Sequence, residues 1–556
     1  MKYSILLSGL LFFVSFTSKA QDSISKADLQ TAARMMDLQY TVAEIDSMYM
    51  GVVRNRQEII KMHATGLSNS VPTSLWQLPE QPWLKRKPGG RKPNFATGKI
   101  VMPKKVKLPA DINDLAYYRL PDLASLIKNR KISSVELTKL FIARLKKYGD
   151  TLECIITLTE GIAMQQAKKA DSLLSKGVYL GMLHGIPYGL KDLFSVKGTK
   201  TTWGAEPYKN QVIDEDAYVY QRLRNAGAIL VAKLTLGALA QGDVWFGGRT
   251  RSPWNLSRGS SGSSAGSASA TVAGLVPFAI GTETLGSIVS PSTACGATGL
   301  RPTFGSVSRT GAMSLCWSLD KIGPICRSAE DAAIVFTYIN GFDDFDGVPA
   351  PEPYRYNSTT EVKKLRVAYA KNYFDQLDST RNEWAVLEAF RKMGVEPEPM
   401  TFPDDSLVWP FDITSIVLGA ESAAAFDMFT RTNVDDQMTR QYRGDWPNYF
   451  RTARFIPAVD YINANRQRSL LMRTIQAAME PYDVVITPTY AGHQLSITNL
   501  TGNPAVCMPN GFDKRSGLPT SVTFLGKLWG EAAILRAADA YQQATGWNTM
   551  RPSLFK

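Results

Sequence analysis

One stretch of the sequence, residues 255–303, has the residue types that acyl-transfer chemistry needs. Its first half is rich in serine and glycine, and it runs directly into an uncharged, Ala- and Val-rich segment at 268–278. A second small cluster, from Thr284 to Ser287, follows soon after. A flexible Gly/Ser linker would have a similar composition. The near absence of charge and the apolar continuation instead favour buried turns.

A buried glycine-rich turn that ends in a serine suits nucleophilic catalysis. Glycine tolerates backbone angles and close approaches that other residues resist. Successive amide N–H groups in such a turn can therefore point at one developing oxyanion. Ser287 stands at the end of the second cluster, so its hydroxyl would lie beside those amides.

The base is harder to assign, because the chain contains only three histidines, His63, His184 and His493. Residues 262–266, Gly-Ser-Ser-Ala-Gly, fit the nucleophile elbow of α/β-hydrolases, with Ser264 as the nucleophile. That alternative, an esterase or lipase, requires a downstream histidine, and His493 is the only candidate. No oxyanion motif of that fold accompanies it.

Several ordered blocks carry a resemblance to a known family. They are His-Gly-Ile-Pro-Tyr-Gly-Leu-Lys-Asp at 184–192, Ser-Gly-Ser-Ser-Ala-Gly-Ser-Ala at 261–268, Gly-Thr-Glu-Thr-Leu-Gly-Ser-Ile at 281–288, Cys-Gly-Ala-Thr-Gly-Leu-Arg-Pro-Thr at 295–303, and Ser-Leu-Asp-Lys-Ile-Gly-Pro at 318–324. Together with Asn-Pro-Ala at 503–505, they resemble the amidase signature family over roughly residues 115–550.

The resemblance implies a triad of Ser287 as nucleophile, Ser263 as proton bridge and Lys191 as base. In the family a cis peptide bond precedes the bridging serine. The family also implies an oxyanion hole, here formed by the backbone amides of Thr284, Leu285, Gly286 and Ser287. The implied activity is hydrolysis of a carboxamide C–N bond to a carboxylic acid and ammonia or an amine, through an acyl-enzyme.

This mechanism is chemically coherent. A lysine can act as a base if burial and hydrogen bonds lower its pKa. The apolar residues 186–190 before Lys191 predict a strand that delivers the amine into a dry site. The chain departs from the family pattern at Ala265, and Leu285 and Val289 replace residues that are often smaller or polar. The last two predict a pocket less suited to a charged group.

The rest of the chain predicts the elements that must position these residues. Ser133 and Glu136 form a capping box before an apolar stripe, and a helix is expected at 216–226, followed by a strand at 228–232. A helix should run from Ser328 to Asn340, with later strands at 365–369, 484–487 and 521–525 and a helix from about 531. This alternation indicates an α/β/α sandwich with a large mixed β-sheet covered by helices.

The N-terminal region differs from the rest. Residues 1–20 have a basic start, an apolar run at 5–16 and small residues before Gln21, which is typical of a secretory signal peptide rather than a membrane span. An uncleaved anchor is the alternative. Residues 21–110 read as a helical and then Pro- and Lys-rich extension, and 111–556 as the catalytic domain. Within it, 400–480 looks like a helical insertion that could shape a pocket. The predicted location is periplasmic or extracellular.

Composition limits the partners. The net charge of +13 is spread thinly without a nucleic-acid motif, so no nucleic-acid partner is expected. The five cysteines include no Cys-x-x-Cys pair, so no metal is expected, and no organic cofactor is implied. The predicted partner is a small-molecule or peptide amide, and a homodimer is left open. Two further alternatives are an amidotransferase A-type subunit, which an exported chain disfavours, and a non-catalytic binding protein on the same fold.

Overall fold

The computed structural model describes residues 24–35, 42, 45, 46, 49, 99–346, 353–405, 408–409, 412–442, 444–453 and 456–555. The chain divides into two compact units, Met1–Leu67 and Ser68–Lys556. In the first unit, helix α1 spans Lys26–Met35, within the stretch predicted to be helical. The predicted signal peptide and most of the extension to residue 110 lie outside the described residues, so both stay predictions.

The described part of the second unit contains an eleven-stranded mixed sheet. Its strand order is β1-β3-β2-β8-β10-β9-β14-β15-β13-β11-β12. The strands are β1 (Ile155–Leu158), β2 (Pro187–Lys191), β3 (Ile229–Leu234), β8 (Ala279–Glu283), β9 (Thr298–Arg301), β10 (Lys321–Cys326), β11 (Val367–Ala370), β12 (Glu398–Met400), β13 (Val484–Pro488), β14 (Ala505–Phe512) and β15 (Pro519–Leu525). Strand β2 runs parallel to both β3 and β8, whereas β10 is antiparallel to β8 and β9.

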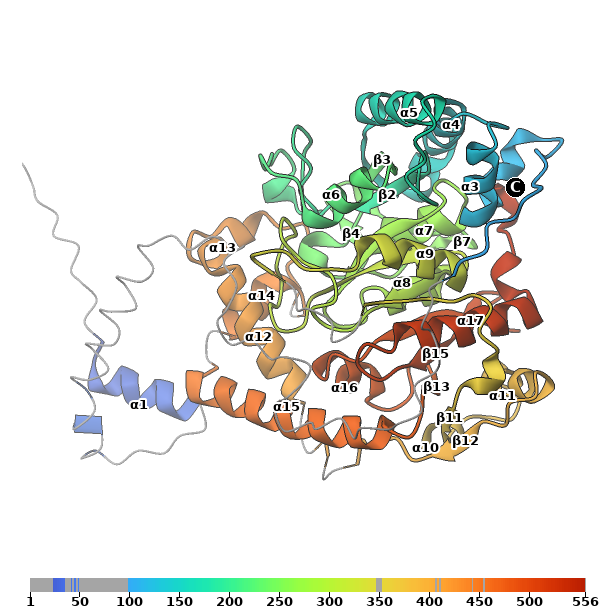
Figure 1. The fold of residues 1–556 in the computed structure, drawn as a ribbon. Coiled ribbons are helices and arrows are strands. Elements are labelled where there is room, and N and C mark those ends of the chain that lie inside the picture. Colours follow the sequence, from blue (N-terminus) through green and yellow to red (C-terminus); the bar gives the residue numbers. More distant parts are fainter. Residues whose placement is uncertain are drawn as a thin grey trace, which may run out of the picture. The chain divides into compact units, whose positions relative to one another are not determined.

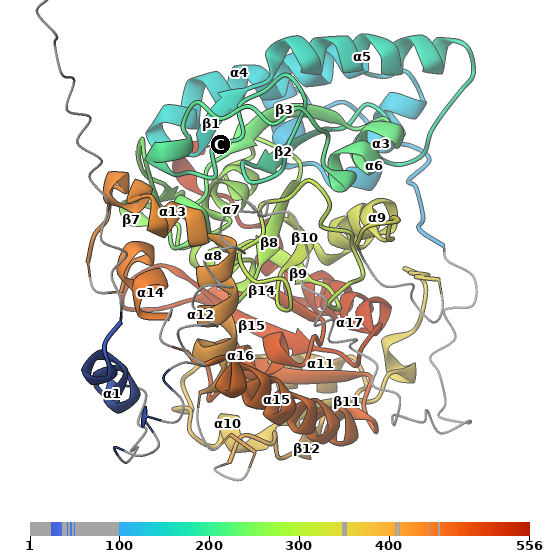
Figure 2. The same ribbon diagram turned by 90° about the vertical axis from the view of Figure 1, so that its left-hand side faces the viewer.

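Helices surround this sheet (Figures 1 and 2). They are α3 (Leu120–Lys128), α4 (Ser134–Leu152), α5 (Glu160–Ser175), α6 (Tyr218–Asn225), α7 (Ala265–Val272), α8 (Val289–Cys295), α9 (Ala329–Ile339), α10 (Lys371–Phe374), α11 (Asn382–Lys392), α12 (Ile413–Ala425), α13 (Asp427–Arg431), α14 (Trp446–Ala453), α15 (Ala458–Met479), α16 (Gln494–Leu500) and α17 (Glu531–Thr545). The predicted fold class, a mixed sheet covered by helices, is confirmed.

Local signals in the sequence set the helix starts. The Ser133 hydroxyl accepts the Glu136 amide at 3.1 Å, and the Glu136 carboxylate accepts the Ser133 amide at 2.9 Å, which is the predicted capping box of α4. Ser328 caps α9 in the same way by accepting the amide of Asp331 at 3.0 Å.

From residue 263 onward the serine- and glycine-rich stretch is part of the core and not a linker. Helix α7 is buried along its whole length, and the apolar segment 268–278 that follows is also buried. Helix α7 packs against both β8 and α8. The stretch therefore brings serines into the interior, where their hydroxyls need partners.

The described residues of the region 400–480 are largely helical, as predicted, and contain α12 to α15. It packs on the loop after β3: the Trp446 indole donates to the Leu239 carbonyl at 2.8 Å, and the Gln241 side chain donates to the Gly444 carbonyl at 2.9 Å. Among the described residues, no helix is both long enough and apolar enough to cross a bilayer.

Candidate active site

Lys191 lies at the carboxyl end of β2, between β3 and β8. All five residues of this strand are buried, and the lysine side chain has no exposed surface. The predicted strand is therefore present, and it carries the amine into the buried interior between β3 and β8. A lysine is rarely buried to this degree without a function or a partner.

Three hydroxyl groups surround the amine. Lys191 Nζ lies 2.8 Å from Ser263 Oγ, 3.1 Å from Ser264 Oγ and 2.8 Å from Thr282 Oγ1. Burial lowers the pKa of Lys191 well below its ordinary value, although the carboxylates of Asp320 and Glu283 act in the opposite direction. A neutral amine in this position can donate two hydrogen bonds and accept one through its lone pair, so it can pair with all three hydroxyl neighbours.

The hydroxyl of Ser264 has a separate role from that of Ser263. Ser264 Oγ donates to the Thr282 carbonyl at 3.1 Å and accepts the Thr282 amide at 3.1 Å. Since its proton is directed at that carbonyl, Ser264 can only accept from Lys191. Ser263 and Thr282 are then the neighbours whose hydroxyls can give a proton to the amine, and Ser263 is the one predicted as proton bridge. The Gly262–Ser263 peptide bond is cis.

Ser287 follows β8 in a tight turn and directly precedes the segment that becomes α8. Gly286 has a φ of +80°, a left-handed conformation that favours glycine. The Ser264 amide donates to the Ser287 carbonyl at 3.1 Å, so the main chain holds the two serine blocks together. Within the described residues, Ser263 contacts Lys191 directly, whereas no Oγ–Oγ hydrogen bond joins Ser263 to Ser287.

The amides predicted to form the oxyanion hole are unoccupied by protein acceptors. Within the described part of the chain, none of the N–H groups of Thr284, Leu285, Gly286 and Ser287 donates a hydrogen bond. The next two amides, of residues 288 and 289, both donate to one Glu283 oxygen at 2.9 Å. The turn thus leaves its N–H groups available for a ligand.

Glu283 is a buried residue that the sequence analysis did not single out. Besides the two amides, its carboxylate accepts from Arg301 at 3.1 Å and from Asn499 at 2.9 Å. Burial alone would raise the pKa of Glu283, but Arg301, the Val289 amide and Asn499 together lower it. The carboxylate therefore fixes the turn that carries Ser287. In the sequence, the signal for this role was the position of Glu283 within the 281–288 block.

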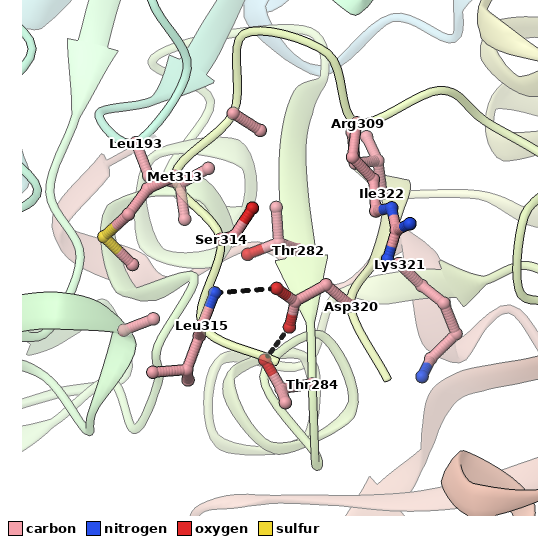
Figure 3. A pocket seen from close by; sticks show the side chains of 12 residues that line it. Leu193, Thr282, Thr284, Arg309, Met313, Ser314, Leu315, Asp320, Lys321 and Ile322 are labelled. Carbon is pink, nitrogen blue, oxygen red and sulfur yellow. Dashed lines mark hydrogen bonds between the residues drawn. The ribbon is translucent and has the colours of Figure 1, made fainter. Parts of the chain in front are cut away.

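A pocket adjoins this centre (Figure 3). It is a shallow hollow that is partly open to solvent, and its enclosed part has room for about one water molecule. Its walls are formed by Leu193, Ala240, Thr282, Thr284, Arg309, Ala312, Met313, Ser314, Leu315, Asp320, Lys321 and Ile322. Thr282 also contacts the Lys191 amine, so the pocket lies next to the catalytic candidates. The helical region 400–480 supplies none of these walls, but its described residues pack behind them: Gly444 accepts from Gln241, and Glu421 accepts from the Ser318 amide and hydroxyl.

The elbow alternative finds no support in the local geometry. His493 is exposed, its ring stacks on Trp409 at 5.6 Å between centroids, and its amide donates to Asp404. The Ser264 hydroxyl is directed at the Thr282 carbonyl. Neither group contacts the other within the described residues. Those residues also contain no cluster of metal-ligating side chains.

Comparisons with known proteins agree with the blocks and the fold. A family model described as Amidase matches residues 136–498. The A-type subunit of the glutamyl-tRNA(Gln) amidotransferase from Marinomonas sp. strain MWYL1 is 33% identical over 483 residues, covering 78% of this chain and 98% of that protein. The corresponding protein of Methylococcus capsulatus is 33% identical over 482 residues, with the same coverage. The crystal structure of the native peptide amidase from Stenotrophomonas maltophilia superposes with a TM-score of 0.69 at 28% identity, covering 78% of this chain and 98% of that one.

The chain therefore belongs to the amidase signature family. It is an enzyme of the amidase class, which acts on amide C–N bonds.

Proposed function

We propose that the protein hydrolyses a carboxamide through an acyl-enzyme on Ser287, with Ser263 as proton bridge and Lys191 as base. The observation that carries this proposal is the 2.8 Å contact between the buried Lys191 amine and Ser263 Oγ. A second support is the hydrogen bond that holds the Ser264 amide on the Ser287 carbonyl, because it keeps the bridging serine beside the nucleophile.

The first step forms the bond between Ser287 Oγ and the amide carbon. The Ser287 proton passes to Ser263 Oγ, and the Ser263 proton passes to the lone pair of neutral Lys191. Burial supports this step because it lowers the pKa of Lys191, so that the amine is free of its proton at a lower pH than an exposed lysine. The carbonyl oxygen becomes an oxyanion that the amides of the 284–287 turn stabilise.

Collapse of the tetrahedral intermediate breaks the C–N bond. The proton on Lys191 returns through Ser263 to the leaving nitrogen, which departs as ammonia or an amine. Water then attacks the acyl-enzyme by the same proton route and releases a carboxylic acid with free Ser287. No metal or organic cofactor enters the scheme.

We also propose that the protein is exported, with residues 1–20 as a signal peptide, to the periplasm or the exterior. The partner would then be a small-molecule or peptide amide and not a nucleic acid. The competing function is that of the amidotransferase proteins, which are 33% identical to this chain. The location of the protein distinguishes the exported amidase from an amidotransferase. If cell fractionation finds the full-length protein in the cytoplasm, the amidotransferase function is favoured.

The mechanism is tested by labelling with a fluorophosphonate probe and mapping the modified peptide by mass spectrometry. Wild type should be modified at Ser287, and the Ser287→Ala variant should not be labelled. In parallel, a panel of amides is offered to wild type, Lys191→Ala, Ser287→Ala and His493→Ala. Turnover should be lost in the first two variants and kept in the third. Modification of Ser264 together with dependence on His493 would replace the proposal with the elbow mechanism.

A further inference from the structure

Asp320 forms part of the pocket wall next to the turn of the proposed oxyanion hole. Figure 3 shows its carboxylate between two parts of that wall. One oxygen accepts the Thr284 hydroxyl at 2.6 Å, and the other accepts the amides of Leu315 and Cys316 at 2.8 and 3.0 Å. All three partners are donors, and an ionised carboxylate is the form that accepts from all of them.

Asp320 is held by neutral groups only. Among the described residues no cation forms an ion pair with it, and the Arg309 guanidinium acts on its charge only through space. Its side chain is only partly buried. Burial raises the pKa of Asp320 above its ordinary value, although the three hydrogen bonds and the Arg309 charge act against that rise. At mildly alkaline pH the group therefore presents a negative charge to the pocket.

The positive groups of the pocket balance this charge only in part, because Arg309 acts on Asp320 through space while it is paired with Asp346. Arg309 lies in an ion pair with Asp346, at 2.7 Å between Nη2 and Oδ1, and its Nε also donates to Asp346. Lys321 donates to the Leu319 carbonyl, and burial lowers the pKa of Lys321 to about 7. At mildly alkaline pH this amine is largely neutral.

The remaining walls are apolar or carry hydroxyls. The apolar side chains are those of Leu193, Ala240, Ala312, Met313, Leu315 and Ile322. Such a surface favours an uncharged hydrocarbon group, since burying apolar area stabilises the complex. A carboxylate would lose its hydration here and face Asp320, and both effects are unfavourable.

We propose that Asp320 makes this pocket selective by charge, so that the enzyme accepts primary amides with neutral or cationic acyl groups and discriminates against anionic ones. This inference rests on the proposed function. In a primary amide the leaving group is ammonia, so the acyl group is the part that must lie against the wall beside Thr284. Through the same Thr284 contact, Asp320 also positions the start of the oxyanion turn.

The test uses three primary amides of similar size and different charge: pentanamide, 5-aminopentanamide and the monoamide of glutaric acid. At mildly alkaline pH and low ionic strength, kcat/KM for the glutaric monoamide should be at least about tenfold below that for pentanamide. The aminopentanamide should equal or exceed pentanamide. Equal or faster hydrolysis of the anionic amide by wild type overturns the proposal.

Two variants separate the charge of Asp320 from its positioning contact. In Asp320→Asn the kcat/KM values of the three amides should come within about threefold of one another. The control variant Glu361→Gln removes an exposed carboxylate from outside the pocket wall and should leave the wild-type order of kcat/KM values unchanged. Thr284→Val removes the hydroxyl that contacts Asp320 and keeps the charge. It should lower kcat for all three amides together and leave their order intact. A charge order that survives in Asp320→Asn contradicts the proposal.

The binding of the same three amides to Ser287→Ala, measured by calorimetry, distinguishes failure of this inference from failure of the proposed function. If wild type hydrolyses none of them, the proposed function fails for this class, and the binding order still tests the charge selectivity. If wild type hydrolyses them without regard to charge, the function stands and the selectivity is wrong. The order of kcat/KM values for the three amides in wild type still tests the charge selectivity if Asp320→Asn folds poorly.

Discussion

Two lysines on neighbouring parallel strands show how the same side chain takes opposite roles. Lys191 ends β2 and Lys233 lies in β3, where the register pairs Lys191 with Leu234 and Leu190 with Lys233. Neither lysine has exposed surface. Lys233 forms an ion pair with Asp192 at 2.7 Å and also donates to the Lys200 carbonyl at 3.1 Å. Lys191 has three hydroxyl neighbours instead.

Burial alone therefore does not make a lysine a general base; the groups in contact with its amine also matter. The contact with Asp192 gives the Lys233 amine a carboxylate partner and holds two strand ends together. Hydroxyl groups can accept from an ammonium, but they compensate much less for its lost hydration. Burial therefore lowers the pKa of Lys191 well below its ordinary value, and one of its hydroxyl neighbours, Ser263, is placed to exchange a proton with it.

The largest expected effect is the loss of activity in Lys191→Met. The variant should hydrolyse an amide at least about 10³-fold more slowly than wild type, because the proton route through Ser263 has lost its acceptor. The protein should still fold, since methionine fits a dry site. Steady-state kinetics together with circular dichroism measures both. A folded variant with more than a tenth of wild-type activity would show that Lys191 is not the base.

The same variant predicts a trend in stability with pH. Because the pKa of Lys191 is lowered in the native state, folding below the ordinary lysine pKa of about 10.4 requires this amine to lose its proton. That cost is present at neutral pH and disappears as the pH rises towards the unfolded value. The melting temperature of Lys191→Met minus that of wild type should therefore be highest near neutral pH and fall towards alkaline pH. A difference that grows with pH would contradict the lowered pKa.

Lys233→Met should lower the stability of the protein strongly and its activity little, which is the reverse of what is expected for Lys191→Met. Removing one partner of a buried ion pair leaves Asp192 uncompensated, and the expected loss is about 3–5 kcal/mol of the free energy of unfolding. Denaturant titration measures this loss. The fraction of protein that stays folded should keep activity within about tenfold of wild type. The double variant Lys233→Met with Asp192→Asn should recover part of the stability, which separates the unpaired charge from simple loss of packing.

A smaller effect is expected from Ser264→Ala. Ser264 only holds the Lys191 amine and β8 in place, so its loss should reduce kcat by about tenfold through misplacement of the base. Fluorophosphonate labelling of Ser287 should slow by a similar factor and not disappear. Complete loss of labelling in a folded Ser264→Ala protein would point to Ser264 as the nucleophile.

The sequence predicted the parts of the site that lie in local motifs. The strand before Lys191, the buried serine blocks and the turn at Ser287 all follow from residues that are close in the chain. The long-range partners could not be found in this way. Asp192 beside Lys191 would be read locally as half of a surface turn, yet its carboxylate is buried against Lys233, which lies on another strand.

The same limit applies to the pocket. In the sequence, Asp320 could be recognised only as a member of the 318–324 block. Its contact with Thr284 depends on the antiparallel pairing of β10 with β8. Glu283 likewise gains its role from Arg301 and Asn499, which come from β9 and α16. Such contacts are set by strand order and helix packing, which periodicity and motif spacing do not specify.

The dependence of kcat/KM on pH, measured with one neutral primary amide, tests the central claim most directly. If neutral Lys191 is the base, kcat/KM rises with pH as this amine loses its proton. The midpoint of the rise should lie below the ordinary lysine pKa of about 10.4, because burial lowers the pKa of Lys191. A profile that peaks below about pH 6, or one that is flat across the alkaline range and unchanged in folded Lys191→Met, would contradict the account.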